Sequence, residues 1–113
     1  MKIYHNPRCS KSRQTLELLQ KNTNEKIEIV EYLNNIPTEK ELTEIIKLLK
    51  IKPEELIRKG EDVYKEKFKG KTLKDSEWIK AMVENPKLIE RPIVISEKKA
   101  IIGRPPEKVL DLF

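Results

Sequence analysis

A single cysteine, Cys9, stands between a short apolar run and a segment with helical spacing, and basic residues surround it. A thiol at a helix N-terminus is stabilised as the thiolate, because unpaired amides and the helix dipole favour an anion there. Arg8, Lys11 and Arg13 add positive charge close to the same position. This pattern predicts an activated nucleophilic cysteine; the alternative is an inert buried thiol.

Two polar side chains flank this cysteine at short spacing. His5 lies four residues before it, and Ser12 lies three residues after it. An imidazole can hydrogen-bond to a thiolate or assist it electrostatically, and a hydroxyl can donate to the sulfur or to a bound anion. We therefore expect Cys9, His5 and Ser12 to form a catalytic group, although His5 could instead serve to pack the loop.

Arginine is used sparingly in this chain. Of the 24 lysines and arginines, five are arginines: Arg8, Arg13, Arg58, Arg91 and Arg104. The planar fork of an arginine binds an oxyanion in a bidentate way, whereas lysine offers only a point charge. Arg91 and Arg104 directly precede prolines. An oxyanion site and a set of scattered surface charges are both compatible with this usage.

The single cysteine and single histidine exclude several kinds of site. One cysteine cannot form an intramolecular disulfide, a zinc site of the cysteine type is disfavoured, and His5 cannot belong to a multi-histidine metal site. Phosphatase-type loops place an arginine after five intervening residues, whereas that position is Thr15 here. If Cys9 performs redox chemistry, the second thiol must come from another molecule.

The size and charge of the chain fit one small domain over residues 1–113. The net charge is +5, but the lysines alternate with glutamates, which is typical of a solvated surface. Aromatic residues make up only 5% and do not alternate with basic ones, so we expect no nucleic-acid partner. No apolar run approaches the roughly 20 residues of a membrane span, and no secretory signal opens the sequence, so we expect a cytoplasmic protein.

Apolar periodicity divides the chain into alternating strands and helices without internal repeats. The predicted strands are 2–4, 26–32, 93–95 and 100–102, with the second buried mostly on one face and the last two forming an antiparallel hairpin. Two of the predicted helices span residues 12–21 and 75–84. Another follows a capping box at Thr38–Glu41. A short one begins at Pro53 and is closed by Gly60, and the last begins at Pro105 and Pro106. Residues 65–74 are charged and show no clear pattern. The order βαβ, helical block, ββα predicts a small α/β fold with parallel strands in its first half.

Six motifs follow one another along the chain. The first, around the cysteine, is Ile3-Tyr4-His5-Asn6-Pro7-Arg8-Cys9-Ser10-Lys11-Ser12-Arg13. The others are Glu31-Tyr32-Leu33, Pro37-Thr38, Leu56-Ile57-Arg58-Lys59, residues 85–94 and Gly103-Arg104-Pro105. In this order they resemble the motifs of the glutaredoxin-coupled ArsC-type arsenate reductases, in the short branch of the ArsC/Spx superfamily. The chain departs from proven arsenate enzymes of the family at Ser10-Lys11, where they carry Gly-Thr.

The resemblance implies both a fold and a set of roles. The fold is thioredoxin-like, with a small mixed four-stranded sheet, a helical insertion at about 38–86 and a cis bond before Pro92. The residue matching Cys9 is the nucleophile, and His5 and Ser12 match residues that tune or orient it. The implied oxyanion-binding residues are Arg58, Arg91 and Arg104.

The implied reaction is the reduction of arsenate to arsenite. Glutathione is the expected co-substrate and glutaredoxin the expected protein partner, with no bound cofactor and no metal. Two alternatives stay open: a general glutathione-linked thiol oxidoreductase without arsenate activity, and an Spx-like regulator that binds RNA polymerase. The regulator senses oxidation through a Cys-x-x-Cys pair, and its second position is Ser12 here.

Overall fold

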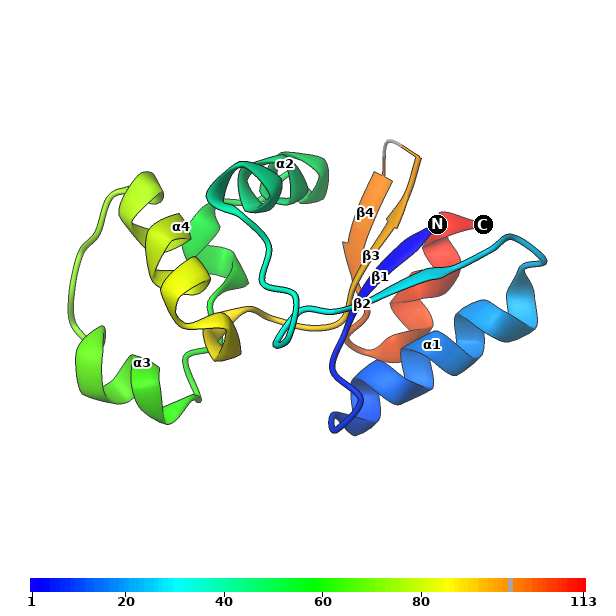
Figure 1. The fold of residues 1–113 in the computed structure, drawn as a ribbon, viewed down its shortest axis with the longest axis horizontal. Coiled ribbons are helices and arrows are strands. Elements are labelled where there is room, and N and C mark those ends of the chain that lie inside the picture. The colour runs from blue at the N-terminus through cyan, green and yellow to red at the C-terminus, as the bar shows by residue number, and fades with distance from the viewer. Residues whose placement is uncertain (98) are drawn as a thin grey trace. The chain divides into compact units, whose positions relative to one another are not determined.

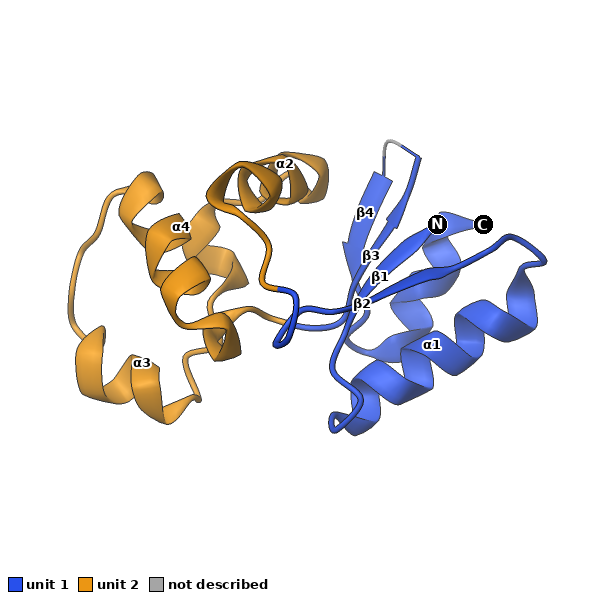
Figure 2. Cartoon of the chain, in the orientation of Figure 1, with its two compact units in different colours: residues 1–35, 91–113 blue, residues 36–90 orange. Residues whose placement is uncertain are grey.

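The protein consists of two compact units, seen in a computed structural model that describes residues 1–97 and 99–113 (Figure 1). Unit 1, blue in Figure 2, comprises residues 1–35 and 91–113, and unit 2, orange, comprises residues 36–90. The helical insertion predicted at about 38–86 falls within unit 2. The chain therefore leaves unit 1 after its second strand and returns to it for the last two strands.

Unit 1 holds a four-stranded mixed sheet with the order β2-β1-β3-β4. Its elements are β1 (Lys2–His5), α1 (Ser10–Asn22), β2 (Glu28–Glu31), β3 (Ile93–Ser96), β4 (Lys99–Ile102) and the 3-10 helix η3 (Pro106–Leu112). β1 and β2 are parallel, whereas β1 pairs with β3 and β3 pairs with β4 in antiparallel fashion. The predicted βαβ and ββα halves, and the thioredoxin-like fold class, are confirmed. Lys98, in the predicted link between the last two strands, lies outside the described residues.

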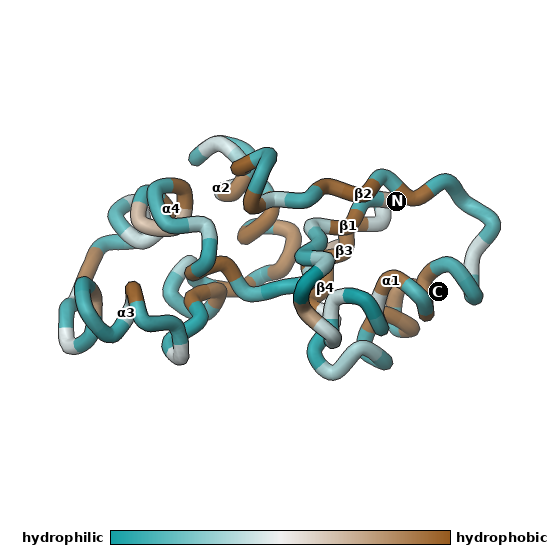
Figure 3. The backbone as a smooth tube through the Cα atoms, turned by 60° about the horizontal axis from the view of Figure 1, so that its bottom comes forward, coloured by the Kyte–Doolittle hydropathy of each residue, from teal (hydrophilic) through white to brown (hydrophobic). Residues whose placement is uncertain are grey.

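The core of unit 1 forms where α1 and η3 pack beside the sheet. Ile3 of β1, Leu19 of α1, Val94 of β3 and Val109 of η3 are each fully buried in one cluster. Burying a side chain of this size stabilises the fold by about 1.5–3 kcal/mol. Hydrophobic and hydrophilic segments alternate along the helices in Figure 3, as amphipathic packing requires. This cluster fixes α1, and with it the residues at its N-terminus.

The second strand is shorter and more exposed than the sequence suggests. It spans Glu28–Glu31 rather than 26–32, and we expected one buried face, but three of its four residues are exposed, with Ile29 at 46%. β2 lies at the edge of the sheet, where, among the described residues, it pairs only with β1. Short edge strands with charged ends are common, since they discourage pairing with other chains.

Unit 2 is helical and contains α2 (Glu39–Leu49), η1 (Pro53–Leu56), α3 (Asp62–Lys67), α4 (Asp75–Glu84) and η2 (Pro86–Leu88). The predicted capping box is present: Thr38 Oγ1 accepts from the Glu41 N–H at 3.1 Å, and Glu41 accepts from the Thr38 N–H at 3.2 Å. The bounds predicted for α4 are confirmed, and its apolar face is buried at Trp78 and Met82.

One prediction in unit 2 was wrong, and one helix was not predicted. Gly60 does not close the helix that begins at Pro53, because η1 already ends at Leu56 and Ile57 turns extended to bridge Ile89. The helix α3 overlaps only the start of the charged segment 65–74, and periodicity does not reveal it because none of its residues is buried. Apolar contact comes instead from its C-cap residue Phe68, whose ring centroid lies 6.0 Å from that of Trp78.

Two peptide bonds before proline are cis, Arg91–Pro92 and Arg104–Pro105. The first agrees with the resemblance, and the second was not predicted. The terminal helix begins at Pro106, with Pro105 as its N-cap residue, and has 3-10 geometry. No helix within residues 1–97 and 99–113 is long and apolar enough to cross a membrane.

Candidate active site

Cys9 is the N-cap residue of α1, and its thiol is free and partly exposed. Its backbone N–H donates to the carbonyl of Asn6 at 3.0 Å, which closes a tight turn over Pro7 and Arg8. Its own carbonyl accepts from the N–H of Arg13 at 3.0 Å and so begins the helical ladder. The side chain thus sits where the first amides of a 13-residue helix lack partners inside the helix.

The pKa of the Cys9 thiol lies below its ordinary value. Burial alone raises this pKa, but the backbone N–H of Ser12, the guanidinium of Arg91 and the backbone N–H of Lys11 all donate toward the sulfur. The positive charge of Arg91 lowers the pKa further. These contacts favour the charged form and outweigh burial, so a larger fraction of the thiol is ionised than in an unperturbed cysteine.

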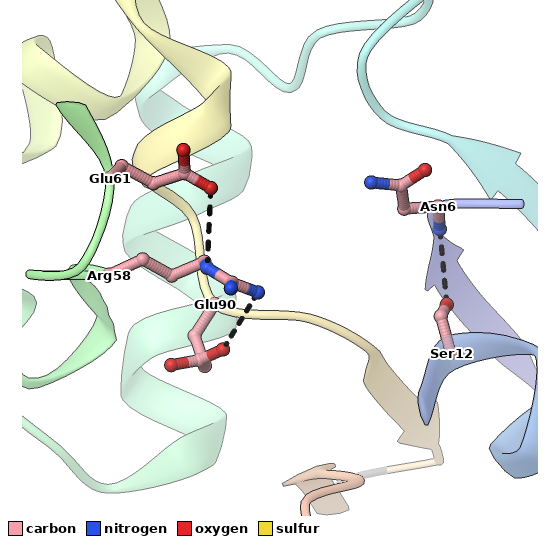
Figure 4. A network of polar contacts seen from close by, with 5 residues as sticks. All are labelled: Asn6, Ser12, Arg58, Glu61 and Glu90. Atoms are coloured by element: carbon pink, nitrogen blue, oxygen red, sulfur yellow. Dashed lines mark hydrogen bonds and ion pairs between the residues drawn. The ribbon is translucent and has the colours of Figure 1, made fainter. Parts of the chain in front are cut away.

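His5 and Ser12 form a buried pair beside the cysteine. His5 Nδ1 lies 2.6 Å from Ser12 Oγ, and the exposed fractions of the two residues are 6% and 0%. The Ser12 oxygen also accepts from the backbone N–H of Asn6 at 3.1 Å (Figure 4). The hydroxyl of Ser12 is therefore engaged by His5, and the group of Ser12 that reaches Cys9 is its backbone N–H.

The pKa of His5 is lowered, chiefly by burial. The charge of Glu31, paired with His5 in the register of β1 and β2, raises this pKa, while the charge of Arg13 lowers it. The imidazole is consequently neutral at neutral pH, so it can either accept the Ser12 hydroxyl proton at Nδ1 or donate one there. It does not supply a positive charge to the thiolate.

Asn6 is a site residue that sequence reasoning missed. It is 7% exposed, and its side-chain Oδ1 accepts from the backbone N–H of Arg8 at 3.0 Å. Arg13 donates from Nη1 to the carbonyl of Pro7 at 2.8 Å and fixes the same turn from outside. An Asn-Pro pair favours a turn, and the reason is visible here, because the asparagine side chain bonds to the backbone two residues further on. Arg13 therefore holds the loop rather than offering a free guanidinium.

Close packing brings the two Arg-Pro segments to α1. Thr15 of α1 donates from Oγ1 to the carbonyl of Gly103 at 3.2 Å, and Gly103 donates its N–H to the carbonyl of Pro92 at 2.9 Å. A Cβ added at Gly103 would lie 2.8 Å from two atoms of Thr15 and 3.0 Å from Pro92. Only glycine permits this approach, which joins the segments bearing Arg91 and Arg104 to the start of α1.

Arg58 lies in unit 2, where its side chain forms ion pairs with two carboxylates. Its Nε is 3.6 Å from Glu61 and its Nη1 is 3.5 Å from Glu90 (Figure 4). Its backbone N–H donates to the carbonyl of Leu88 at 2.7 Å. The side chain is 24% exposed. The two carboxylates orient the guanidinium without covering it, and its predicted contact with an oxyanion stays a prediction.

Unit 1 thus brings together four of the six predicted site residues, His5, Cys9, Ser12 and Arg91, through direct contacts. Arg104 follows Gly103 and is placed by the packing of that glycine. Within the part of the chain that the structure describes, no group of three or more His, Cys, Asp or Glu residues could hold a metal ion.

Comparison with known proteins gives matches over nearly the whole chain. A model of the ArsC family matches residues 4–112. The uncharacterised protein YfgD of Escherichia coli strain K12 is 50% identical over 99% of this chain and 95% of its own length. An arsenate reductase of Haemophilus influenzae is 45% identical over 98% of this chain and 97% of its own length. The solved arsenate reductase from Vibrio cholerae superposes with a TM-score of 0.93 at 42% identity, covering 100% of this chain and 98% of that one.

Proposed function

Because this chain belongs to the ArsC family, we propose that it reduces arsenate to arsenite, with Cys9 as the nucleophile. The observation that carries the proposal is the Cys9 thiol at the start of α1, whose pKa is lowered by backbone N–H groups and the Arg91 guanidinium. A thiolate in this setting attacks an electrophilic centre, and the same positive groups attract an anionic substrate. The arsenate reductases of Haemophilus influenzae and Vibrio cholerae support the choice of substrate.

Three arginines are proposed to bind the oxyanion. Arg91 already contacts the sulfur, so an arsenate that it holds lies beside the nucleophile. Arg104 is proposed as the second, since its segment packs on α1, and Arg58 as the third by its match to the family motif. Their charges offset the negative charge that grows as the thiolate attacks.

The chemistry requires an external thiol because the chain has one cysteine. The Cys9 thiolate bonds to arsenic(V), and one arsenate oxygen leaves as water after protonation. Glutathione then attacks the Cys9 sulfur, and the sulfur–arsenic bond breaks with its electron pair passing to arsenic. Arsenic(III) leaves as arsenite, and Cys9 remains as a mixed disulfide with glutathione. The thiolate of glutaredoxin attacks the glutathione sulfur and releases Cys9 as thiolate.

The test is arsenate-dependent NADPH oxidation by the purified protein, coupled to glutathione, glutaredoxin and glutathione reductase. The Cys9→Ser variant should abolish turnover and keep arsenate binding. Arg91→Lys keeps the positive charge but should still lose activity, because lysine cannot bind the oxyanion in the bidentate way that arginine does. Turnover of Cys9→Ser near that of the wild type would refute the role of Cys9.

The alternatives correspond to distinct outcomes. A protein without arsenate turnover that still exchanges Cys9 with glutathione disulfide would be a general glutathione-linked thiol oxidoreductase. A regulator of the Spx type would bind RNA polymerase, but its second switch position is the buried Ser12, hydrogen-bonded to His5. A thiol that depends on glutathione and glutaredoxin needs a reducing compartment, so the proposed location is the cytoplasm.

A further inference from the structure

Unit 1 contains a polar cavity of ≈ 370 Å³ at the C-terminal ends of the two parallel strands. Five of its lining residues are polar: His5, Asn6, Arg8, Glu31 and Asn34. β1 ends at His5 and β2 ends at Glu31, which are partners in the strand register. Crevices at the carboxyl ends of parallel strands are a common location for ligands. The volume lies within the range of about 300–1,000 Å³ that small-molecule sites occupy.

The lining offers hydrogen-bonding groups that the protein itself leaves unused. Among the described residues, the Nδ1 atom of His5 contacts Ser12, but no hydrogen bond of Nε2 is present, although the residue is 6% exposed. Asn6, at 7% exposed, uses Oδ1 for the backbone of Arg8, and its amide NH₂ has no protein partner. Among the described residues, neither atom is one of the fully buried polar atoms that lack a partner. Both are therefore open to the cavity and can bind a polar ligand there.

The charges of the cavity have both signs. Arg8 and Glu31 both line it and are both exposed. A carboxylate at the wall repels a free oxyanion, which argues against arsenate as the occupant. An α-amino-acid group carries a carboxylate and an ammonium on one carbon, so it offers a complementary charge to Arg8 and to Glu31.

The cavity is close enough to the cysteine for a small thiol to bridge the two. The hydrogen bond from the Cys9 N–H to the Asn6 carbonyl closes a four-residue turn, and such turns hold their ends within about 7 Å. An extended peptide of three residues spans about 10 Å. A tripeptide thiol anchored in the cavity can therefore reach the Cys9 sulfur.

We propose that this cavity binds the α-amino-acid end of a small peptide thiol of the glutathione type, with Arg8 on its carboxylate and Glu31 on its ammonium. The bound thiol presents its sulfur to Cys9. The inference rests on the proposed function only in its need for an external thiol, and its test uses no arsenate.

The test is the rate at which Cys9 exchanges with glutathione disulfide, followed by mass spectrometry of the intact protein. In this reaction the Cys9 thiolate attacks one disulfide sulfur, forms the mixed disulfide and releases one glutathione thiolate. Each rate is divided by the rate with hydroxyethyl disulfide, which has the same reacting bond and no charges. The ratio cancels any change in the reactivity of Cys9 itself. The variants are Arg8→Gln and Glu31→Gln, and Glu28→Gln is the matched control on β2, outside the cavity.

We expect the ratio to fall about tenfold in each cavity variant, because each loses one charge-assisted contact, and to stay at the wild-type value in Glu28→Gln. A ratio unchanged in both Arg8→Gln and Glu31→Gln would overturn the inference, as would an equal fall in the control. A wild type that fails to reduce arsenate but shows the expected pattern of ratios would refute the proposed function and leave the inference standing.

Discussion

Gly103→Ala is the substitution that tests most directly how the two Arg-Pro segments are held on α1. The added Cβ would lie 2.8 Å from both Cγ2 and Oγ1 of Thr15 and 3.0 Å from Cγ of Pro92. Ordinary van der Waals contact begins at 3.4 Å, so all three contacts are too short. Rotation of the Thr15 side chain gives no relief, because both of its branches lie at the same short distance.

The expected loss in the free energy of unfolding depends on whether the Thr15 side chain can move away from the added Cβ. Thr15 is fully buried, and its hydroxyl is bonded to the carbonyls of Lys11 at 2.8 Å and Gly103 at 3.2 Å. Overpacking a tight site costs about 1–3 kcal/mol, and we expect the upper half of this range because three atoms clash at once. In a Thr15→Ala background the same change should cost less than about 1 kcal/mol, since only the contact with Pro92 remains.

The assay is chemical unfolding followed by far-ultraviolet circular dichroism. Fluorescence of Trp78 is a poor primary signal because this residue lies in unit 2, whereas Gly103 lies in unit 1; it serves as the control for unit 2. A loss below about 0.5 kcal/mol, the range of neutral surface substitutions, would refute the packing argument. Strict additivity of Gly103→Ala with Thr15→Ala would refute it as well.

Other changes test the thiolate, the buried pair and the helix cap. Arg91→Ala should raise the pKa of the Cys9 thiol, because it removes a hydrogen bond and a positive charge, and ultraviolet absorbance of the thiolate across a pH titration measures this. Because that pKa is lower in the folded than in the unfolded state, ionisation of Cys9 stabilises the fold above the unfolded pKa. This contribution is lost as the pH falls through the folded pKa, so the stability difference from Cys9→Ser should shrink there. Ser12→Ala should cost about 1–3 kcal/mol in denaturant unfolding, since it leaves His5 and a buried amide without their partner. Thr38→Ala should cost about 1 kcal/mol through loss of the capping box, with the change seen in the fluorescence of unit 2.

The fold was predictable wherever the sequence carries a local signal. The capping box at Thr38, the bounds of α4 and the antiparallel pairing of β3 with β4 could all be predicted, because each depends on residues close together in the chain. The exposure of Ile29 and the helix α3 could not be, because they depend on which element lies at the edge of the sheet and on contacts such as Phe68 with Trp78. Both depend on the tertiary arrangement, which does not show in the apolar periodicity of the sequence.

The site was predictable as a list of residues and less so as a set of contacts. The position of Cys9 after a strand and before a helix placed its sulfur at the right helix end. The backbone N–H of Ser12 contacts the sulfur, whereas its hydroxyl contacts His5. Which group faces which partner depends on the direction of the backbone, and residue types alone do not predict it. The close approach at Gly103 had no sequence signal beyond the glycine itself.

Different groups stabilise the charge of the Cys9 thiolate and hold the turn that carries it. The thiolate of Cys9 is stabilised by main-chain N–H groups and by Arg91, so its charge does not depend on protonation of the imidazole. His5 is neutral and is tied through Ser12 to the backbone of Asn6, which forms the turn that carries the cysteine. The imidazole therefore acts on the position of the nucleophile rather than on its charge. The contacts that lower the pKa of the Cys9 thiol are therefore independent of a cationic histidine, because they come from main-chain N–H groups and from Arg91.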